Sequence, residues 1–244
     1  MRLLLLAGTG EARQIANALA KEPRVSAVAS LAGQTRSPVA LGLPTRIGGF
    51  GGRDAFGDYL GHEKIDAVLD ATHPFAHQIS HRTAEVCGDR GVPYLQFLRP
   101  PWMPGEGDDW TFLNAEEEAA NHIATGAVVF LATGPQNLDR FAGLQGCRIY
   151  CRRIDPPRAP FPLPGGDWLV GRPPFSVEEE MALFHDLAVD WLVVKNSGGW
   201  ASRSKLDAAR DLGLKVAMIR RPPQPQAPKV STVADALSWV RSLT

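Results

Sequence analysis

A strand, a glycine turn and the start of a helix follow one another near the beginning of the sequence, in Leu3-Leu4-Leu5-Leu6-Ala7-Gly8-Thr9-Gly10-Glu11-Ala12. The continuous apolar run over residues 3–7 is typical of a strand buried on both faces of a parallel sheet. From Glu11 to Ala20 the apolar residues recur at the spacing of one helical face. A glycine turn in this context lets a pyrophosphate approach backbone N–H groups. The stretch therefore predicts a dinucleotide site, and the alternative is a tight turn without a ligand.

The match to the fingerprint Gly-x-Gly-x-x-Gly is partial, because Arg13 stands at the position of the third glycine. The strand before the turn and the helix after it still favour a nucleotide. The expected cofactor contacts in this turn are Gly8, Thr9, Gly10, Glu11 and Ala12.

The end of the second strand distinguishes between two dinucleotides. NAD would require an acidic residue there, and the sequence has Ser30, Thr35 and Arg36 instead. These side chains suit the ribose 2′-phosphate of NADP. The alternative interpretation is that Arg36 is an ordinary surface arginine. Replacing Arg36 with glutamate should weaken NADPH binding far more than NADH binding.

Strands and helices alternate along the rest of the chain, which predicts mostly parallel sheets and an α/β fold. Helices are expected over residues 11–20, 53–60, 74–90, 116–124, 203–212 and 233–243, and another begins after the N-cap Ser176 with Glu179 in a capping box. Residues 155–174 hold seven prolines and are expected to form a long loop. Strands are expected over residues 3–7, 25–31, 46–47, 65–69, 92–98, 110–113, 127–132, 147–152, 191–194 and 215–219.

A turn-rich stretch, Arg99-Pro100-Pro101-Trp102-Met103-Pro104-Gly105, divides the chain into two similar halves. We expect an NADP-binding Rossmann-like domain over residues 1–100 and a second α/β domain over residues 101–244. Parallel sheets bind ligands at the carboxyl ends of their strands, and the polar loops fall there. The prediction is two Rossmann-like domains whose sheets face a shared cleft.

Composition excludes several classes of protein. The 244 residues carry 26 Lys and Arg against 26 Asp and Glu, so bulk charge does not indicate a nucleic-acid binder. Three cysteines do not make a disulfide framework, which favours a reducing compartment. No apolar run approaches the roughly 20 residues that span a bilayer. We expect a soluble, cytoplasmic protein without membrane or nucleic-acid partners.

The segment Asp70-Ala71-Thr72-His73-Pro74-Phe75 ends a strand in polar groups. Thr72 and Pro74 are candidate cofactor contacts. His73 either orients the ligands or caps the following helix. His73, His77 and His81 are spaced by four, but no acidic residue or cysteine accompanies them at zinc-site spacing, so no metal is expected.

In the second half, Lys195-Asn196-Ser197-Gly198-Gly199 is the densest polar loop. Its lysine supplies a cation, its polar side chains supply donors, and its glycines let a ligand approach the backbone. The alternative is a turn with Lys195 packed along the strand end. Thr133 and Gly134 form a similar, weaker turn. Arg152 and Arg153 could clamp an anionic substrate, or could belong to a solvated loop face.

Taken in order, these loops resemble the precorrin-6A reductase family of cobalamin biosynthesis, nearly end to end. Two segments depart from the family pattern: Gln96, where a basic residue is expected, and Thr133-Gly134-Pro135-Gln136. The resemblance rests on Gly8–Ala12, Asp70–Ala76, Pro93-Tyr94-Leu95 with Arg99-Pro100, Pro174-Phe175-Ser176 and Lys195–Gly199.

The resemblance implies an NADPH-dependent reductase of a conjugated, carboxylate-rich tetrapyrrole. A hydride would pass to ring carbon 19, reduce the C18–C19 double bond and give precorrin-6B, without flavin or metal. His73 and Lys195 are then the catalytic candidates, and the proton donor is His73, Lys195 or solvent. The expected substrate contacts are Arg99, Thr133, Gly134, Arg152, Arg153, Asn196, Ser197 and Gly198.

Two alternatives stay open at this point: a non-catalytic NADP-sensing protein, and a reductase of another substrate. The expected partner is the small-molecule tetrapyrrole, with room for transient contact with neighbouring enzymes of the cobalamin pathway.

Overall fold

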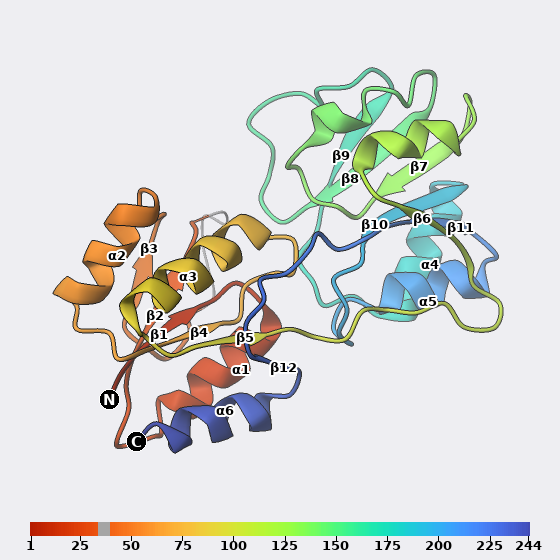
Figure 1. Cartoon of the computed structure of the whole chain (residues 1–244). Helices are drawn as coiled ribbons and strands as arrows, with labels where there is room; N and C mark the ends of the chain where they lie inside the picture. Colours follow the sequence, from red (N-terminus) through yellow and green to blue (C-terminus); the bar gives the residue numbers. More distant parts are fainter. Residues whose placement is uncertain (34–39) are drawn as a thin grey trace. The chain divides into compact units, whose positions relative to one another are not determined.

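A computed structural model describes residues 1–33 and 40–244 of the protein (Figure 1). The chain divides into two compact units. The first unit comprises Met1–Pro100 and Pro222–Thr244, and the second unit comprises Pro101–Arg221. Each unit has a six-stranded sheet, and the strands described in both sheets are paired in parallel. The α/β fold with parallel sheets is thus confirmed, whereas the cleft expected between the sheets stays a prediction.

The sheet of the first unit has the strand order β12-β5-β4-β1-β2-β3. Its central strand β1 is buried on both faces, as its apolar run predicts. Leu3 and Leu5 pack with α1 and α6, whereas Leu4 and Leu6 pack with α2 and α3 on the opposite face (Figure 1). The elements are β1 (Arg2–Leu6), α1 (Gly10–Leu19), β2 (Ser26–Leu31), β3 (Thr45–Ile47), α2 (Arg53–His62), β4 (Ala67–Asp70), α3 (His77–Arg90), β5 (Tyr94–Phe97), β12 (Lys229–Val230) and α6 (Val233–Ser242).

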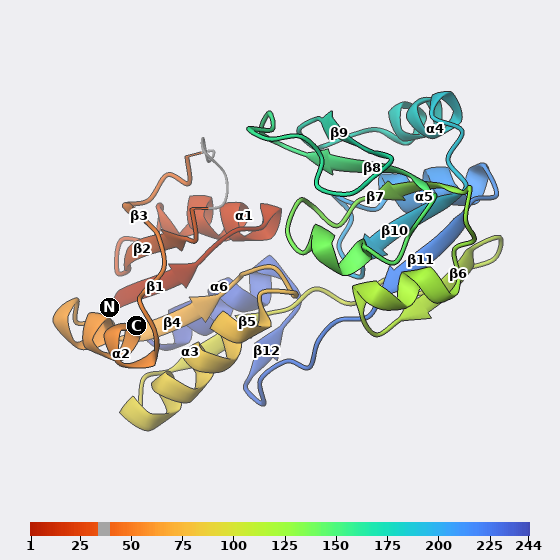
Figure 2. The ribbon, with the colours of Figure 1, turned by 90° about the horizontal axis from the view of Figure 1, so that it is seen from above.

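The sheet of the second unit has the order β6-β11-β10-β7-β8-β9, which can be followed in Figure 2. Leu192 and Val194 of its central strand pack with Phe184 and Leu206 from two helices, α4 and α5. Two short 3-10 helices, η1 and η2, contact each other in the same unit. The elements are β6 (Asp109–Leu113), η1 (Glu116–Asn121), β7 (Val128–Leu131), η2 (Leu138–Phe141), β8 (Arg148–Arg153), β9 (Gly166–Val170), α4 (Val177–Asp186), β10 (Trp191–Lys195), α5 (Ser204–Asp211) and β11 (Lys215–Ile219).

The last segment of the chain corrects the expected division into residues 1–100 and 101–244. Residues 222–244 belong to the first unit, not to the second. Lys229 and Val230 pair with Gln96 and Phe97 of β5, and α6 packs against α1. A two-residue strand leaves no periodicity in the sequence, and an amphipathic helix does not show which sheet it covers. The sequence therefore could not place this segment.

Three expected elements differ from the structure. The helix expected from Pro74 begins at His77, because Thr72 and Phe75 donate to the side chains of Asp70 and His73 and hold a turn before it. The helix expected over residues 116–124 is the shorter 3-10 helix η1. The expected loop over residues 155–174 contains β9, a short edge strand that has no buried position and follows a proline-rich stretch.

The N-terminus of α4 confirms the predicted capping box. The Ser176 hydroxyl accepts from the backbone N–H of Glu179 at 3.1 Å, and the Glu179 carboxylate accepts from the backbone N–H of Ser176 at 2.8 Å. The start of α4 is therefore fixed by local sequence alone.

Candidate functional site

The strand register of the first unit brings the predicted cofactor loops to one edge of its sheet. Leu6 of β1 lies level with Ser30 of β2 and with Asp70 of β4. Asp70 in turn lies level with Gln96 of β5, and Ser30 with Arg46 of β3. The segments that follow these residues share the carboxyl edge, where parallel sheets bind ligands.

The glycine turn at this edge has the geometry of a phosphate site. Gly8 has φ +148°, a conformation that favours glycine, and no atom of the described residues lies within 4 Å of a Cβ built on Gly8 or Gly10. The Thr9 hydroxyl caps α1 by accepting from the N–H of Ala12 at 3.1 Å, and it donates to the carbonyl of Ala71 at 3.0 Å. The first N–H groups of α1 precede its hydrogen-bond ladder and provide an anion site beside open space.

Glu11 and Arg99, predicted as a cofactor contact and a substrate contact, form an ion pair. The guanidinium donates to the carboxylate at 2.9 Å, and both side chains are largely buried. The pair joins the first turn of α1 to the segment after β5. Each residue therefore has a structural role in the first unit, whatever it contributes to a ligand.

Ser30 has an arginine neighbour at the end of β2. Its hydroxyl accepts from Nη1 of Arg46 at 2.8 Å, and the same guanidinium donates to the carbonyls of Gly48 and Gly49. The guanidinium carbon lies 3.9 Å from the centroid of the Phe50 ring, which fixes its plane. The predicted contacts Thr35 and Arg36 lie outside the described residues.

A buried carboxylate organises the loop after β4. Asp70 is fully buried and accepts from the N–H and the hydroxyl of Thr72, at 3.0 and 2.7 Å, and from the Tyr94 hydroxyl at 2.8 Å. Burial raises the pKa of Tyr94, and the nearby Asp70 carboxylate raises it further, so Tyr94 stays a neutral donor. The Thr72 hydroxyl, a predicted cofactor contact, is thereby used within the loop.

His73 and Pro74 take part in the same loop. Nδ1 of His73 accepts from the N–H of Phe75 at 3.3 Å, so in this arrangement the ring carries no proton on Nδ1. The bond closes the turn before α3 and is not a helix cap, because α3 begins at His77 and has no side-chain cap, so the predicted capping role is wrong. The Pro74 carbonyl accepts from the amide of Gln224, and Gln224 also accepts from Gln96. Gln96 thus connects β5 with the returning C-terminal segment.

In the second unit the predicted residues also gather at the carboxyl edge. Lys195 of β10 lies level with Ile219, and Arg153 of β8 lies level with Val170. Thr133 lies two residues after the end of β7, the strand between these two. The shared edge is therefore confirmed for Lys195, Thr133 and Arg153.

Lys195 is held by a carboxylate that the sequence did not single out. Its Nζ lies 3.4 Å from Oε1 of Glu116, a buried residue at the start of η1. Arg140 donates to the other oxygen of the same carboxylate at 2.9 Å. Glu116 thus lies between two cations and fixes the position of the Lys195 ammonium.

The loop after Lys195 is anchored by Trp102. The Asn196 amide accepts from the N–H of Trp102 at 2.8 Å and donates to its carbonyl at 2.9 Å, and the Trp102 indole donates to the Gly199 carbonyl at 2.8 Å. Asn196 and Ser197 are buried, whereas Gly198 has φ +67°. Asn196, predicted as a substrate contact, therefore fixes the entry of the chain into the second unit, because its amide is paired with Trp102.

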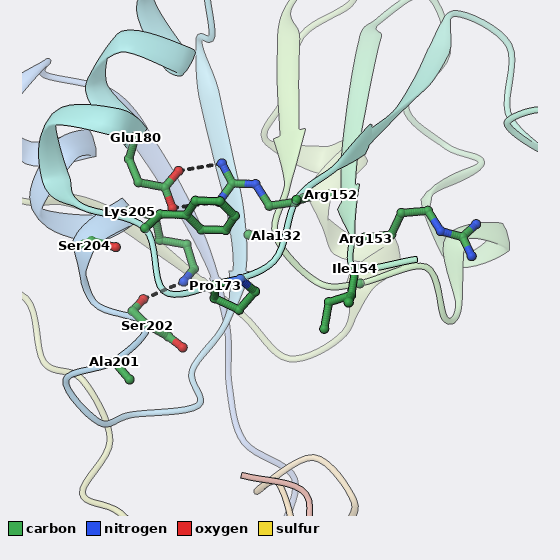
Figure 3. Close-up of a pocket in the computed structure, with 13 residues that line it drawn as sticks. Ala132, Arg152, Arg153, Ile154, Pro173, Glu180, Ala201, Ser202, Ser204 and Lys205 are labelled. Carbon is green, nitrogen blue, oxygen red and sulfur yellow. Dashed lines mark hydrogen bonds and ion pairs between the residues drawn. The ribbon is translucent and has the colours of Figure 1, made fainter. Parts of the chain in front are cut away.

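Arg152 forms a buried ion pair with Glu180, so its side chain does not belong to a solvated loop face. Its two terminal nitrogens each donate to an oxygen of Glu180 at 2.7 Å, and its guanidinium lies over the rings of Phe130 and Phe175. Arg153 extends away from this pair (Figure 3), and its guanidinium lies over the ring of Trp168. The two neighbouring arginines therefore have different environments.

A pocket of about 190 Å³ opens at this edge of the second unit (Figure 3). Its lining includes three of the predicted substrate contacts, Gly134, Arg152 and Arg153. Glu180 and Lys205 complete its charged lining. The hydroxyl of Thr133, beside the pocket, is buried and has no hydrogen-bond partner among the described residues.

The remaining histidine and cysteine side chains give weaker indications of a functional site. Within residues 1–33 and 40–244, no three His, Cys, Asp or Glu side chains are grouped so that they could hold a metal ion. His81 faces the carbonyl of Pro223 at 3.0 Å. The three cysteines are buried and unbridged, and burial raises the pKa of Cys87 and of Cys151 to about 12.

In the described part of the chain, no helix has the length and apolar character needed to cross a membrane.

Two parallel α/β units, one with a glycine turn at a helix N-terminus and the other with a cationic pocket, define a two-unit protein of the Rossmann-like class. Comparison with known proteins specifies it further. The chain belongs to the precorrin-6x reductase family CbiJ/CobK, whose profile matches residues 2–241.

The similarity to individual members of this family is high and extends over the whole chain. A precorrin-6A reductase of Rhodococcus erythropolis is 46% identical, with 100% of this chain and 98% of that protein covered. One of Rhodobacter capsulatus is 41% identical, with 98% and 95% covered. The solved structure of a CobK precorrin-6A reductase superposes with a TM-score of 0.95 at 40% identity and covers 100% of this chain and 97% of that one.

Sequence reasoning missed several residues at the two sites: Arg46, Trp102, Glu116, Glu180 and Lys205. A signal existed for two of them. Arg46 lies in the expected third strand, whose end must lie beside that of the second. Lys205 lies in the first turn of the helix that follows the Lys195 loop, so it must start near the same edge. Nothing local marks Glu116 or Glu180 as buried partners.

Proposed function

We propose that this protein reduces precorrin-6A to precorrin-6B with NADPH. Its family makes it an oxidoreductase of cobalamin biosynthesis that acts on a CH–CH group. The observation that carries the proposal is the full-length similarity to precorrin-6A reductases at 40% identity or more, in sequence and in structure. The coenzyme, the carbon that accepts the hydride and the residue roles are the proposed details.

The first unit supports NADPH as the coenzyme. The glycine turn and the start of α1 suit a pyrophosphate, and the open space at Gly8 and Gly10 lets it approach the backbone. No carboxylate ends β2, where one would hold the ribose of NAD. Ser30 and the Arg46 guanidinium stand there instead and suit a 2′-phosphate.

Arg46 gives a direct test of coenzyme choice. We expect Arg46→Gln to weaken NADPH binding by about tenfold, the equivalent of about 1.4 kcal/mol, and to leave NADH binding nearly unchanged. The reason is that only NADPH carries the 2′-phosphate. The dissociation constants are measured by fluorescence titration. Arg53→Gln is the matched control, because Arg53 pairs with Glu85 on the helical side of the same unit. Equal weakening of both coenzymes would assign Arg46 to the fold alone.

The nicotinamide supplies the hydride when the coenzyme is bound. The chain's own residues bind and orient the reactants and supply a proton, since reduction of C18–C19 adds one hydride and one proton. Lys195 holds a proton on Nζ, in a position fixed by Glu116. The donor nitrogen of the His73 ring is Nε2, because Nδ1 accepts from Phe75. Solvent is the third source of the proton.

Removing Lys195 tests its role in reduction. We expect Lys195→Met to lower kcat for precorrin-6A reduction by about a hundredfold or more, because a positioned proton donor contributes roughly 10²–10⁴-fold. Binding of NADPH should stay within twofold. The measurement is steady-state turnover alongside a coenzyme titration. Arg140→Gln, which removes the other cation of Glu116, is the control for local structure. Unchanged turnover would remove Lys195 from the site.

The overall proposal is tested by adding precorrin-6A to the purified protein and NADPH. We expect NADPH oxidation that depends on precorrin-6A and yields one precorrin-6B per NADPH, followed by absorbance. Tight NADPH binding without such oxidation would favour a non-catalytic NADP-binding protein. Oxidation with another acceptor only would indicate a reductase of another substrate.

A further inference from the structure

Two cations that line the pocket of the second unit, Arg153 and Lys205, have no carboxylate within ion-pair distance among the described residues, and Arg153 extends away from the Arg152–Glu180 pair. Of its charged residues, Arg152 and Glu180 neutralise each other through their two hydrogen bonds. Lys205 donates from Nζ to the carbonyl of Ser202 at 2.5 Å, and within the described chain no carboxylate lies within ion-pair distance of this ammonium (Figure 3). An ammonium has three donors, so two stay available to a ligand.

The start of α5 adds to this positive potential. Ser204 and Lys205 are its first two residues and line the pocket, and no side chain caps the helix. The uncapped N–H groups and the positive end of the helix dipole favour an anion. Pro173 and Phe175 form an apolar part of the wall, which strengthens any ion pair inside. Two independent features, the ammonium and the helix start, thus point to an anionic ligand.

The volume of the pocket limits the size of the ligand that can enter it. About 190 Å³ is below the usual 300–1,000 Å³ of a pocket that encloses a whole ligand. A macrocycle does not fit, whereas a carboxymethyl or carboxyethyl side chain does. We propose that this pocket binds a side-chain carboxylate of the tetrapyrrole substrate, with the Lys205 ammonium as its ion-pair partner. This assignment rests on the proposed function, and it gives the second unit the task of orienting the macrocycle by one of its arms.

The charge state of Lys205 makes the assignment testable by pH. Burial lowers the pKa of Lys205 to about 8, with Arg152 also lowering it and Glu180 opposing the shift. These two groups face the amine from β8 and α4. On its own helix, Asp207 is paired with Arg203, and β11 packs on α5 through apolar residues. Substrate binding therefore requires a proton that this amine loses as pH rises through about 8.

The experiment measures the kinetics of holoenzyme variants between pH 7 and 9.5, a range chosen around a pKa of about 8. For the wild type we expect kcat/KM for precorrin-6A to fall above this pKa and to level off about tenfold lower, at the value of the variant that lacks the charge. Lys205→Arg, which keeps its charge, should abolish the fall. Lys205→Met should raise KM for precorrin-6A by about tenfold at pH 7, leave kcat and the KM for NADPH within twofold, and give a flat profile.

Lys215→Met is the matched control, because Lys215 lies at the start of β11, away from the carboxyl edge. An unchanged KM in Lys205→Met, or an alkaline fall that persists in both Lys205 variants, would overturn the proposal. A rise in KM for NADPH instead would mean that the pocket holds a phosphate of the coenzyme, and this outcome also overturns it.

A second measurement needs no turnover. Acetic anhydride acetylates neutral amines, and mass spectrometry resolves each of the six lysines. Propionate, at constant ionic strength and pH 8, should slow acetylation of Lys205 and not of Lys215, because a bound carboxylate favours the ammonium. Equal rates with chloride and propionate would overturn the carboxylate subsite. If protection occurs but no precorrin-dependent NADPH oxidation is found, the subsite stands and the proposed reaction fails.

Discussion

Replacing Gly10 with alanine is expected to leave the fold intact and to weaken NADPH binding by about tenfold to a hundredfold. Within residues 1–33 and 40–244, no atom lies within 4 Å of the added Cβ, and the backbone of Gly10 is not left-handed, so the substitution meets no obstacle from these residues. The methyl group would occupy the space through which the pyrophosphate reaches the backbone. Losing one charge-assisted hydrogen bond costs about 1.5–3 kcal/mol. Coenzyme titration and thermal unfolding measure both effects.

Gly88→Ala is the control for the Gly10 variant. Gly88 lies in α3, on the helical side of the same unit, and also has open space at its Cβ. The substitution should stabilise the helix by about 0.5–1 kcal/mol and leave NADPH binding unchanged. If Gly10→Ala binds NADPH as tightly as Gly88→Ala does, the coenzyme does not lie against the glycine turn. Gly8 is unsuitable for this comparison, because its φ of +148° makes any side chain strained.

The second large effect concerns stability. Glu180→Ala should lower the free energy of unfolding by about 3–5 kcal/mol, because it leaves the largely buried Arg152 guanidinium without its carboxylate. The measurement is urea denaturation followed by tryptophan fluorescence. Since the chain has two compact units, the second unit should unfold at lower urea than the first, and the two transitions should separate.

Two further variants separate the effect of losing the buried ion pair from the effect of losing a carboxylate in the first turn of α4. Glu178→Ala changes an exposed carboxylate in the same first turn of α4 and should shift the urea transition far less than Glu180→Ala does. The double variant Arg152→Met with Glu180→Leu removes both charges and should restore most of the stability, since buried ion pairs compensate their desolvation poorly. If Glu180→Ala costs no more than Glu178→Ala, the buried pair contributes nothing to the second unit.

Local patterns predicted the features that depend on neighbouring residues. The apolar run of β1, the turn at Gly8 and the capping box at Ser176 each lie within a few residues, and the structure contains all three. The rule that parallel strands end at one edge then predicted that Lys195 and Arg153 share an edge.

Side-chain roles set by distant partners could not be predicted. Asn196 is polar and follows a strand, which suits a substrate contact, yet its amide pairs with Trp102, 94 residues earlier. Likewise, the sequence suggests that Arg152 is solvated, whereas in the structure its guanidinium pairs with the Glu180 carboxylate. A single sequence carries the chemistry of these groups but not the identity of their partners, and burial decides which of them stay available for a ligand.

The return of residues 222–244 to the first unit has a consequence for biosynthesis of the chain on the ribosome. All strands and helices of the second unit lie within Pro101–Arg221, whereas the sheet that begins with β1 is completed only by β12 and covered by α6, which follow the second unit in sequence. The unit translated first is therefore completed last. Until residues 222–244 have left the ribosome, the edge of β5 stays uncovered, and an exposed strand edge of this kind is a natural substrate for chaperones.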